Sequence, residues 1–224
     1  MKKCLIVATL ALFSMMGMQA QIVSSRSVNV KTTEVKKPKT TTWMLRAGMN
    51  VGKFVGDGAD ETDSKIGYDV AFSFQKPIKD IGLYWGMEFA LGTRGYTIKD
   101  EGGYGEGEDF KQMSHNFRWS PFTLGYRYDI NNKFAVEAHL GAFVSVDYAG
   151  KMKIGEGYDD LSIGNWDEWY EDDWNRFDAG MALGVGVWYD RFNLDFTWQR
   201  GFVDAISDWD VYSSNLMLRL GIAF

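Results

Sequence analysis

From Trp43 to the end of the chain, apolar residues repeatedly alternate with polar or small ones. In the segment 83–92, large apolar residues take the odd positions, while the even positions hold glycine, alanine, tyrosine and Glu88. Successive side chains of a β-strand point to opposite faces, so this period of two predicts a strand with one apolar face. Seven other segments share the pattern, and we expect strands near 43–51, 68–75, 83–92, 122–128, 134–147, 177–189, 192–199 and 215–224. Pro121 marks a bulge or an irregular start of the fourth strand.

The expected strands are about 9–11 residues long, which is the length that crosses a bilayer when a strand is tilted. The segments between them alternate in length, with long ones at 52–65, 98–113, 149–175 and 202–211 and short ones at 77–81, 129–132 and 190–191. Outer-membrane barrels have short periplasmic turns and long external loops. A soluble β-sandwich, the alternative all-β fold, has no reason to sort its loops in this way. The pattern predicts an eight-stranded antiparallel up-and-down transmembrane β-barrel.

The first 20 residues have the features of an export signal. Lys2 and Lys3 precede an apolar run from Leu5 to Met18, and a small-residue cleavage pattern ends at Ala20. The run is shorter than the roughly 20 residues of a membrane-spanning helix, which argues against the alternative of a retained anchor. We therefore expect a signal peptide at 1–20, a flexible periplasmic tail at 21–42 and the outer-membrane barrel at 43–224. A short strand at 27–30 is the alternative for part of the tail.

Composition narrows the chemistry further. The single cysteine, Cys4, precedes the apolar run and would leave with the signal, so we expect a mature chain without thiol chemistry, disulfides or a lipid-modified cysteine. The formal charge of −6 becomes −8 without Lys2 and Lys3, because residues 1–20 contain no acid. A chain this acidic is a poor candidate for binding nucleic acid. The 16% aromatic content and 25 glycines suit either a barrel or a sandwich and do not choose between them.

The alternation also assigns charged residues to the inward face of the barrel. The lumen of an eight-stranded barrel is only wide enough for side chains, so a general porin is excluded. We expect the inward charges to pair with one another, because unpaired buried charge is costly. The predicted lumen network consists of Arg46, Arg94, Arg127 and Arg219 with Glu88, Glu137, Asp178 and Asp195. A proton or ion path through these residues is the alternative.

The predicted external loops are acidic and aromatic. Trp166, Trp169, Tyr170 and Trp174 in the third loop either contact a partner or a glycan or pack on the barrel rim, and the sequence leaves both open. Acid clusters in the loops can hold Ca²⁺ or Mg²⁺, but solvated surface loops explain them as well. We expect no catalytic, cofactor-binding or metal-binding residues, and no cofactor. The expected partners are outer-membrane lipid or lipopolysaccharide and an envelope protein.

The sequence contains two histidines, His115 and His139. Ser114 and His115 are neighbours on an expected strand, so their side chains point to opposite faces. His139 lies mid-strand and inward, where we expect it to pack in the lumen. Neither forms a recognisable catalytic set, which disfavours an enzyme such as a lipid-A-modifying barrel. The leading hypothesis is a non-enzymatic envelope barrel, and the alternative is an accessory subunit of a secretion or uptake complex.

The strand motifs carry a family resemblance. The residues WMLRAGMN at 43–50, SPFTLGYRY at 120–128, DAGMALGVG at 178–186 and WQRGF at 198–202 resemble the small outer-membrane β-barrel domain family of Bacteroidota, the PorT-like proteins. The aromatic end at Phe224 is also typical of bacterial outer-membrane barrels. The resemblance implies the barrel fold across nearly the whole mature chain and, through PorT, a link to secretion. It supplies no catalytic residues.

Overall fold

The computed structural model describes residues 41–59, 62–79, 81–98, 110–154, 157–161, 175–205 and 210–224. The expected signal peptide and nearly all of the expected tail lie outside these residues. One 3₁₀ turn, η1, spans Asp57–Ala59. The described strands are β1 (Thr42–Val55), β2 (Thr62–Pro77), β3 (Leu83–Ile98), β4 (Phe110–Asp129), β5 (Phe134–Ile154), β6 (Gly157–Leu161), β7 (Phe177–Tyr189), β8 (Phe192–Asp204) and β9 (Tyr212–Ala223).

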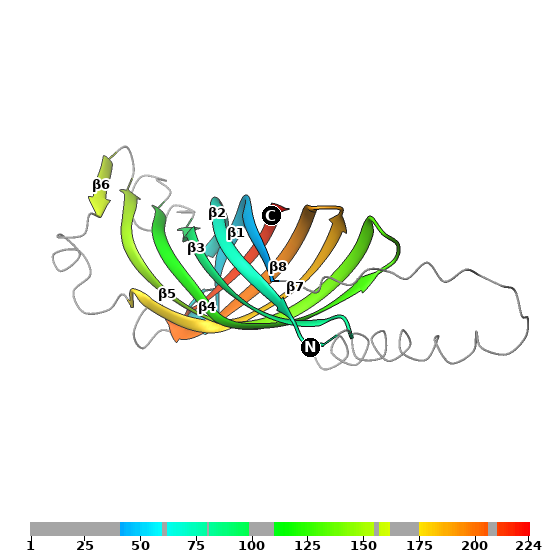
Figure 1. Cartoon of the computed structure of the whole chain (residues 1–224). Helices are drawn as coiled ribbons and strands as arrows, with labels where there is room; N and C mark the ends of the chain where they lie inside the picture. Colours follow the sequence, from blue (N-terminus) through cyan, green and yellow to red (C-terminus); the bar gives the residue numbers. More distant parts are fainter. Residues whose placement is uncertain are drawn as a thin grey trace, which may run out of the picture. The chain divides into compact units, whose positions relative to one another are not determined.

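Eight of these strands form a closed antiparallel barrel (Figure 1). Each barrel strand pairs with its neighbour in the sequence, and the last strand, β9, pairs with β1 to close the circle. Strand β6 pairs with the end of β5, where Gly150 lies opposite Leu161, and forms a hairpin outside the circle. The predicted eight-stranded up-and-down barrel is therefore confirmed.

The two ends of the barrel differ in their connections. One end, the turn end, carries the short turns at 78–82, 130–133 and 190–191. The two-residue turn uses Asp190 in the left-handed region, at φ 55°. The other end, the loop end, carries the remaining connections, including the β5–β6 hairpin.

Most strands are longer than the sequence predicted, whereas β7 has the expected bounds, 177–189. The barrel strands have 12 to 21 residues, against the expected 9 to 11 or so. Strand β4 begins at Phe110, well before the expected start, and β5 continues to Ile154 through the first part of the predicted third loop. The connection between β1 and β2 shrinks to residues 56–61, so the contrast between long and short connections is weaker than expected. Backbone N–H and C=O groups beyond the expected strand ends need hydrogen-bond partners. At the loop end they find them in the neighbouring strand, so the strand pairing continues there.

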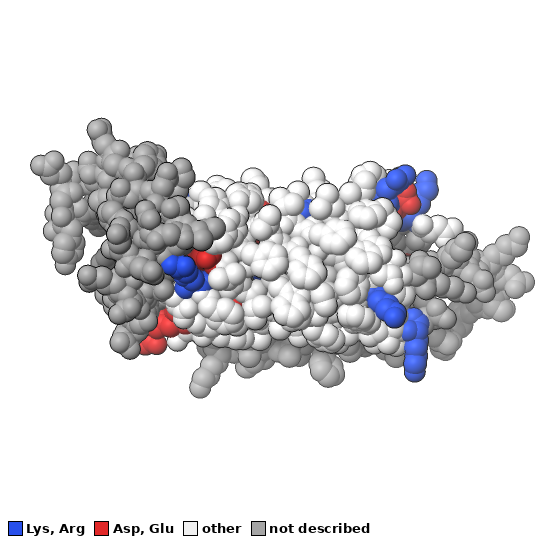
Figure 2. Space-filling view, turned by 60° about the vertical axis from the view of Figure 1, so that its left-hand side comes forward, with Lys and Arg blue, Asp and Glu red and all other residues white. Residues whose placement is uncertain are grey.

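The outward face of the barrel is apolar. Its large side chains are exposed, as shown by Leu45, Phe89, Leu140, Leu183, Val185, Phe196 and Leu218, each between 42% and 55% exposed. In Figure 2 the charged side chains of the visible face gather at the two ends, and the surface between them is almost entirely white. An apolar band between polar ends is what a membrane barrel presents to lipid. Among the described residues, no helix is long and apolar enough to cross a membrane.

A bulge in β4 changes which residues face inward. Between Trp119 and Phe122, β4 advances three residues while β5 advances two, and the same extra residue shifts the pairing with β3. Pro121, which lacks a backbone N–H, lies within this irregularity. Before the bulge the even-numbered residues, such as Arg118, are buried; after it the even-numbered residues are exposed, and the odd-numbered ones are buried, as Gly125 is, or part-buried, as Arg127 is. The bulge that Pro121 predicted is therefore present, in the middle of the strand rather than at its start.

Candidate functional site

The inward face of the barrel is polar and almost completely buried. The eight charged residues that the sequence placed in the lumen all lie there, and each is in an ion pair. Seven are less than 9% exposed, and Arg127, near the turn end, is part-buried. The structure adds Asp69, Arg118 and Asp147 to the network.

Arg219 lies at the centre of the network. Its guanidinium is 2.7 Å from Asp195, 2.8 Å from Glu88 and 3.1 Å from Asp69. These three acids come from β8, β3 and β2, so the side chain of β9 reaches strands on both sides of the lumen. A planar guanidinium with five donors suits this role, because it can bind several carboxylates at once.

Two further arginines complete the centre. Arg118 lies 2.7 Å from Asp69 and 3.4 Å from Glu88. Arg46 lies 2.7 Å from Glu88 and 3.9 Å from Glu137. Sequence reasoning missed Arg118, because counting in steps of two back from Phe122 crosses the bulge and puts it on the wrong face.

A second group of charges lies toward the loop end. Arg94 is 2.7 Å from Asp147 and 3.6 Å from Asp178, and Ser213 donates a hydrogen bond to Asp178. Asp147 is not part of the network that the sequence predicts. Its pairing with Arg94 depends on side chains of β3 and β5 meeting over β4, the strand between them, which no local pattern shows.

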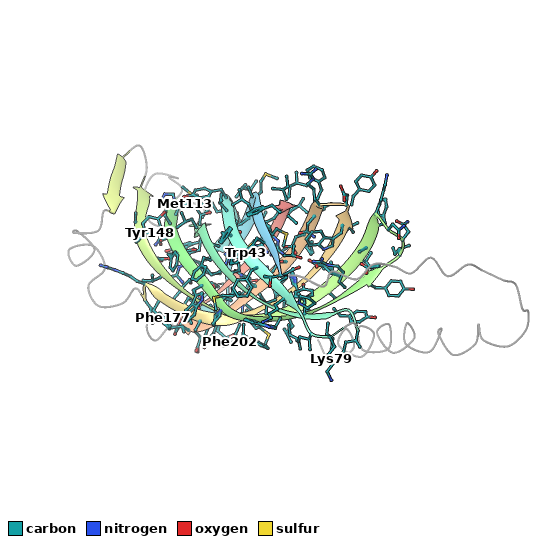
Figure 3. All side chains as sticks on the ribbon, viewed as in Figure 1. Trp43, Lys79, Met113, Tyr148, Phe177 and Phe202 are labelled. Atoms are coloured by element: carbon teal, nitrogen blue, oxygen red, sulfur yellow. The ribbon has the colours of Figure 1, made fainter. Side chains whose placement is uncertain are left out.

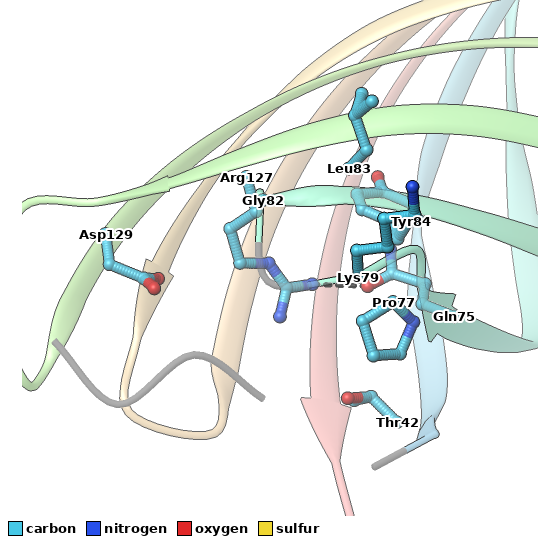
Figure 4. A pocket seen from close by; sticks show the side chains of 9 residues that line it. All are labelled: Thr42, Gln75, Pro77, Lys79, Gly82, Leu83, Tyr84, Arg127 and Asp129. Carbon is cyan, nitrogen blue, oxygen red and sulfur yellow. Dashed lines mark hydrogen bonds between the residues drawn. The ribbon is translucent and has the colours of Figure 1, made fainter. Parts of the chain in front are cut away.

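Arg127 organises the turn end of the lumen. It lies 3.1 Å from Glu137, and its guanidinium carbon is 3.8 Å from the ring centroid of Trp188. It also donates a hydrogen bond to Gln75, drawn as a dashed line in Figure 4. A small pocket beside it is lined by Thr42, Gln75, Pro77, Lys79, Gly82, Leu83, Tyr84, Arg127 and Asp129 (Figure 4).

Apolar clusters close the lumen at both ends. At the loop end, Phe54 and Tyr96 pack edge to face at 5.0 Å, within a buried cluster that includes Ala59, Ala205 and Val211. At the turn end, the buried side chains are Met44, Ala135 and Trp188, with Ala223 packed against them. The charged network therefore lies between two apolar caps.

His139 does more than fill space in the lumen. Its Nε2 is 3.3 Å from Thr197 Oγ1 and 3.5 Å from Asp195 Oδ2. His139, Asp195 and Glu137 form a buried group in which the imidazole nitrogen and one oxygen of each carboxylate lie within 4.8 Å of one another. Sequence reasoning assigned His139 to packing alone, since nothing in its own strand shows that Asp195 lies across from it.

The remaining candidates are the loop aromatics and the pair Ser114 and His115. The predicted interaction residues Trp166, Trp169, Tyr170 and Trp174 lie outside the described residues. His115 is on the outward face, where its Nδ1 is 3.1 Å from the Tyr68 hydroxyl, while neighbouring Ser114 is buried. Figure 3 labels Met113 and Tyr148 toward the loop end and Lys79 at the turn end.

The arrangement favours rigidity over transport. The described lumen pairs five arginines with six carboxylates between its two apolar clusters, and a small cavity lined in part by Arg46, Glu88, His139 and Thr197 lies among them. Removing one partner of such a pair leaves a buried charge uncompensated, which costs about 3–5 kcal/mol. The network therefore ties together strands that are not neighbours in the barrel.

Comparison with known proteins places this geometry in a family. No curated protein sequence matches the chain. Among solved structures, the chain is similar to Neisserial surface protein A, with 16% identity and a TM-score of 0.44 over 81% of this chain and 97% of that one. It is similar to Ail, the attachment invasion locus protein of Yersinia pestis, with 16% identity and a TM-score of 0.43 over 82% and 99% of the two chains. It is also similar to OprG from Pseudomonas aeruginosa, with 15% identity and a TM-score of 0.43 over 83% of this chain and 97% of that one.

Residues 19–207 match the family described as outer membrane protein beta-barrel domain. The chain therefore belongs to the outer membrane protein beta-barrel domain family and is an outer-membrane β-barrel protein.

Proposed function

We propose that this protein is a non-enzymatic barrel of the cell envelope, with a closed lumen and with loops that interact at the cell surface. The observation that carries the proposal is the filling of the lumen. Arg219 and its acidic partners occupy the centre, and buried Phe54 and Trp188 lie in the caps at the two ends. A solute would have to break several buried ion pairs to pass.

The proposal includes an orientation. The turn end faces the periplasm and the loop end faces the outside, as in other outer-membrane barrels. Residues 1–20 direct export and are removed, and residues 21–42 form a periplasmic tail. Exposed aromatic side chains support a membrane position for the band: Trp43, Tyr126, Tyr128 and Tyr189 lie near the turn end, and Tyr68 lies nearer the loop end.

Cysteine labelling tests the orientation. Single cysteines at Gly105, Trp169 and Asp190 are exposed on intact cells to a membrane-impermeant thiol reagent. The only natural cysteine, Cys4, lies in the proposed signal, so the background is low. We expect labelling at 105 and 169 and none at 190 until the outer membrane is permeabilised. Labelling of position 190 alone on intact cells would show the opposite orientation.

Conductance tests the closed lumen. The purified barrel, inserted in a planar lipid bilayer, is expected to give no steady ion conductance, with an open porin measured in parallel as the control. A stable conductance in the wild-type protein would contradict the proposal. A variant in which Arg219, Glu88 and Asp195 are all replaced by glycine removes the centre of the network and provides the matched comparison.

A second function, accessory subunit of a secretion or uptake complex as in the PorT-like proteins, is favoured by one feature. Strand β6 ends the sheet, and among the described strands only β5 pairs with it. An unpaired strand edge can bind a strand of another protein. A photo-crosslinking residue at Asp159 in β6 is expected to capture a specific envelope protein in cells, while one at Lys133 in a turn is not. Equal capture at both positions, or none at Asp159, would argue against this role.

A further inference from the structure

We propose that Glu137, His139 and Asp195 bind a divalent transition-metal ion inside the lumen, with Zn²⁺ as the probe. The inference goes beyond the proposed envelope function and does not depend on it. It rests on three observations: the spacing of the three ligand atoms, the orientation of the two carboxylates and the space that glycines leave for the side chains.

The spacing suits a metal centre. Two ligands that are each about 2.1 Å from a tetrahedral ion lie about 3.4 Å apart. His139 Nε2 and Asp195 Oδ2 are 3.5 Å apart, and with a carboxylate oxygen of Glu137 they lie within 4.8 Å of one another. Small side-chain shifts at Glu137 would complete a three-ligand set.

The carboxylates are oriented so that one oxygen of each has no hydrogen-bond donor among the described residues. Arg219 and the Thr197 hydroxyl donate to Oδ1 of Asp195, and Arg127 donates to Oε2 of Glu137. The other two oxygens, Asp195 Oδ2 and Glu137 Oε1, are buried and accept no hydrogen bond from the described residues. Groups that hold a ligand from behind in this way orient it and raise its affinity for a metal.

Two glycines of β7 create the space for the ligands. Gly184 lies between His139 of β5 and Thr197 of β8, and Gly186 lies between Glu137 and Asp195. A Cβ at position 184 would be 2.1 Å from His139 Nε2, and a Cβ at 186 would be 3.0 Å from Glu137 Oε1. Side chains from β5 and β8, the two neighbours of β7, can therefore meet over its inward face.

The donor set indicates the kind of ion. Imidazole nitrogen favours first-row transition metals, whereas calcium and magnesium prefer oxygen ligands alone. One histidine and two carboxylates, with a water or the Thr197 hydroxyl as a fourth ligand, match a four-coordinate zinc site.

Arg127 and Arg219, which bind the other oxygens of the two carboxylates, oppose the ion, and so does Arg46. The Arg46 guanidinium is 3.9 Å from Glu137 Oε1, but it makes its closest ion pair with Glu88, at 2.7 Å. A metal at Glu137 would repel this guanidinium. Arg46→Gln is therefore expected to strengthen metal binding several-fold. The substitution would not strengthen metal binding if His139 only packed in the lumen.

The experiment measures metal bound per folded chain. The tag-free protein is stripped with a chelator in denaturant, refolded in detergent with Zn²⁺ or Co²⁺, gel-filtered and analysed for metal. We expect about one ion per wild-type chain. His139→Gln and Asp195→Asn are each expected to lower the metal affinity by more than the roughly 10–100-fold that is lost when a residue supporting a ligand is replaced. His115→Gln removes the only other histidine, on the outward face, and is expected to bind like wild type. Folding of each variant is checked by its circular dichroism.

The outcomes are decisive even if a variant does not fold. X-ray absorption of the wild-type Zn²⁺ or Co²⁺ form is expected to show one imidazole ligand and otherwise oxygen ligands. Less than stoichiometric metal in the wild type, an imidazole-free spectrum, or equal binding by a folded His139→Gln variant would overturn the proposal. Loss of binding in His115→Gln would place the ion on the outer surface and overturn it as well.

Discussion

Arg219 on β9 and Glu88 on β3 are 131 positions apart in the sequence, yet their side chains form an ion pair of 2.8 Å. Strands β9 and β3 do not pair with each other; β1 and β2 separate them in the sheet. The contact is made across the lumen and exists only because β1 and β9 close the barrel. Arg219 therefore links the last barrel strand to the third.

The first prediction concerns this arginine. Arg219→Leu is expected to lower the free energy of unfolding by about 3–5 kcal/mol, because Asp69, Glu88 and Asp195 lose a buried cationic partner. Equilibrium urea unfolding in lipid vesicles measures the loss. Arg191→Leu, in an exposed turn, is the matched control and is expected to change stability by no more than about 0.5 kcal/mol. Similar effects of the two substitutions would mean that the lumen network contributes little stability.

The second prediction concerns the contact between β5 and β7. Gly184→Ala is expected to destabilise the barrel by about 1–3 kcal/mol, because the new Cβ would meet the imidazole of His139. In the His139→Ala background, Gly184→Ala is expected to cost less, and the remaining cost comes from Thr197 Oγ1, which lies 2.7 Å from the new Cβ. A double-mutant cycle from urea unfolding gives the coupling. A coupling near zero would show that the two positions do not touch.

The third prediction tests where the membrane lies. Leu183 is at the middle of β7 and Tyr189 at its turn end, and their exposures are nearly equal, 51% and 50%. Leu183→Arg is expected to cost about 2–4 kcal/mol in vesicles, since an arginine at the bilayer midplane is poorly solvated, whereas Tyr189→Arg is expected to cost about 1 kcal/mol or less beyond the lost tyrosine contacts. Unfolding in vesicles compares the two. Equal costs would place both positions at the same depth and contradict the membrane-spanning band.

The fourth prediction concerns the turn end. Arg127→Lys keeps the charge but loses the planar guanidinium that stacks on Trp188 and binds Glu137. We expect a loss of about 1–2 kcal/mol, of the size of a desolvated cation–π contact with its hydrogen bonds. Urea unfolding of Arg127→Lys in the Trp188→Leu background provides the control, where the loss should shrink. An unchanged loss in that background would show that the stacking contributes nothing.

Much of the fold follows from local patterning. Alternation placed Arg46, Glu88, Glu137 and Arg219 on the inward face, and the structure has them there. It underestimated the strands near the loop end, because a bulge in β4 and another at Tyr148 in β5 each insert an extra residue and reverse the alternation. Arg118 fell on the wrong side of the first bulge for this reason, and its ion pair with Asp69 was not predicted.

Outside the bulges in β4 and β5, the sequence by itself determined which side chains face lipid and which face the lumen, because a period of two is a property of each strand alone. Only the tertiary structure decided which inward charges meet. Arg94 with Asp147, and His139 with Asp195, depend on the register between strands and on closure through β1 and β9. Register and closure arise from hydrogen bonding among all eight barrel strands together, so no single segment of the sequence contains them.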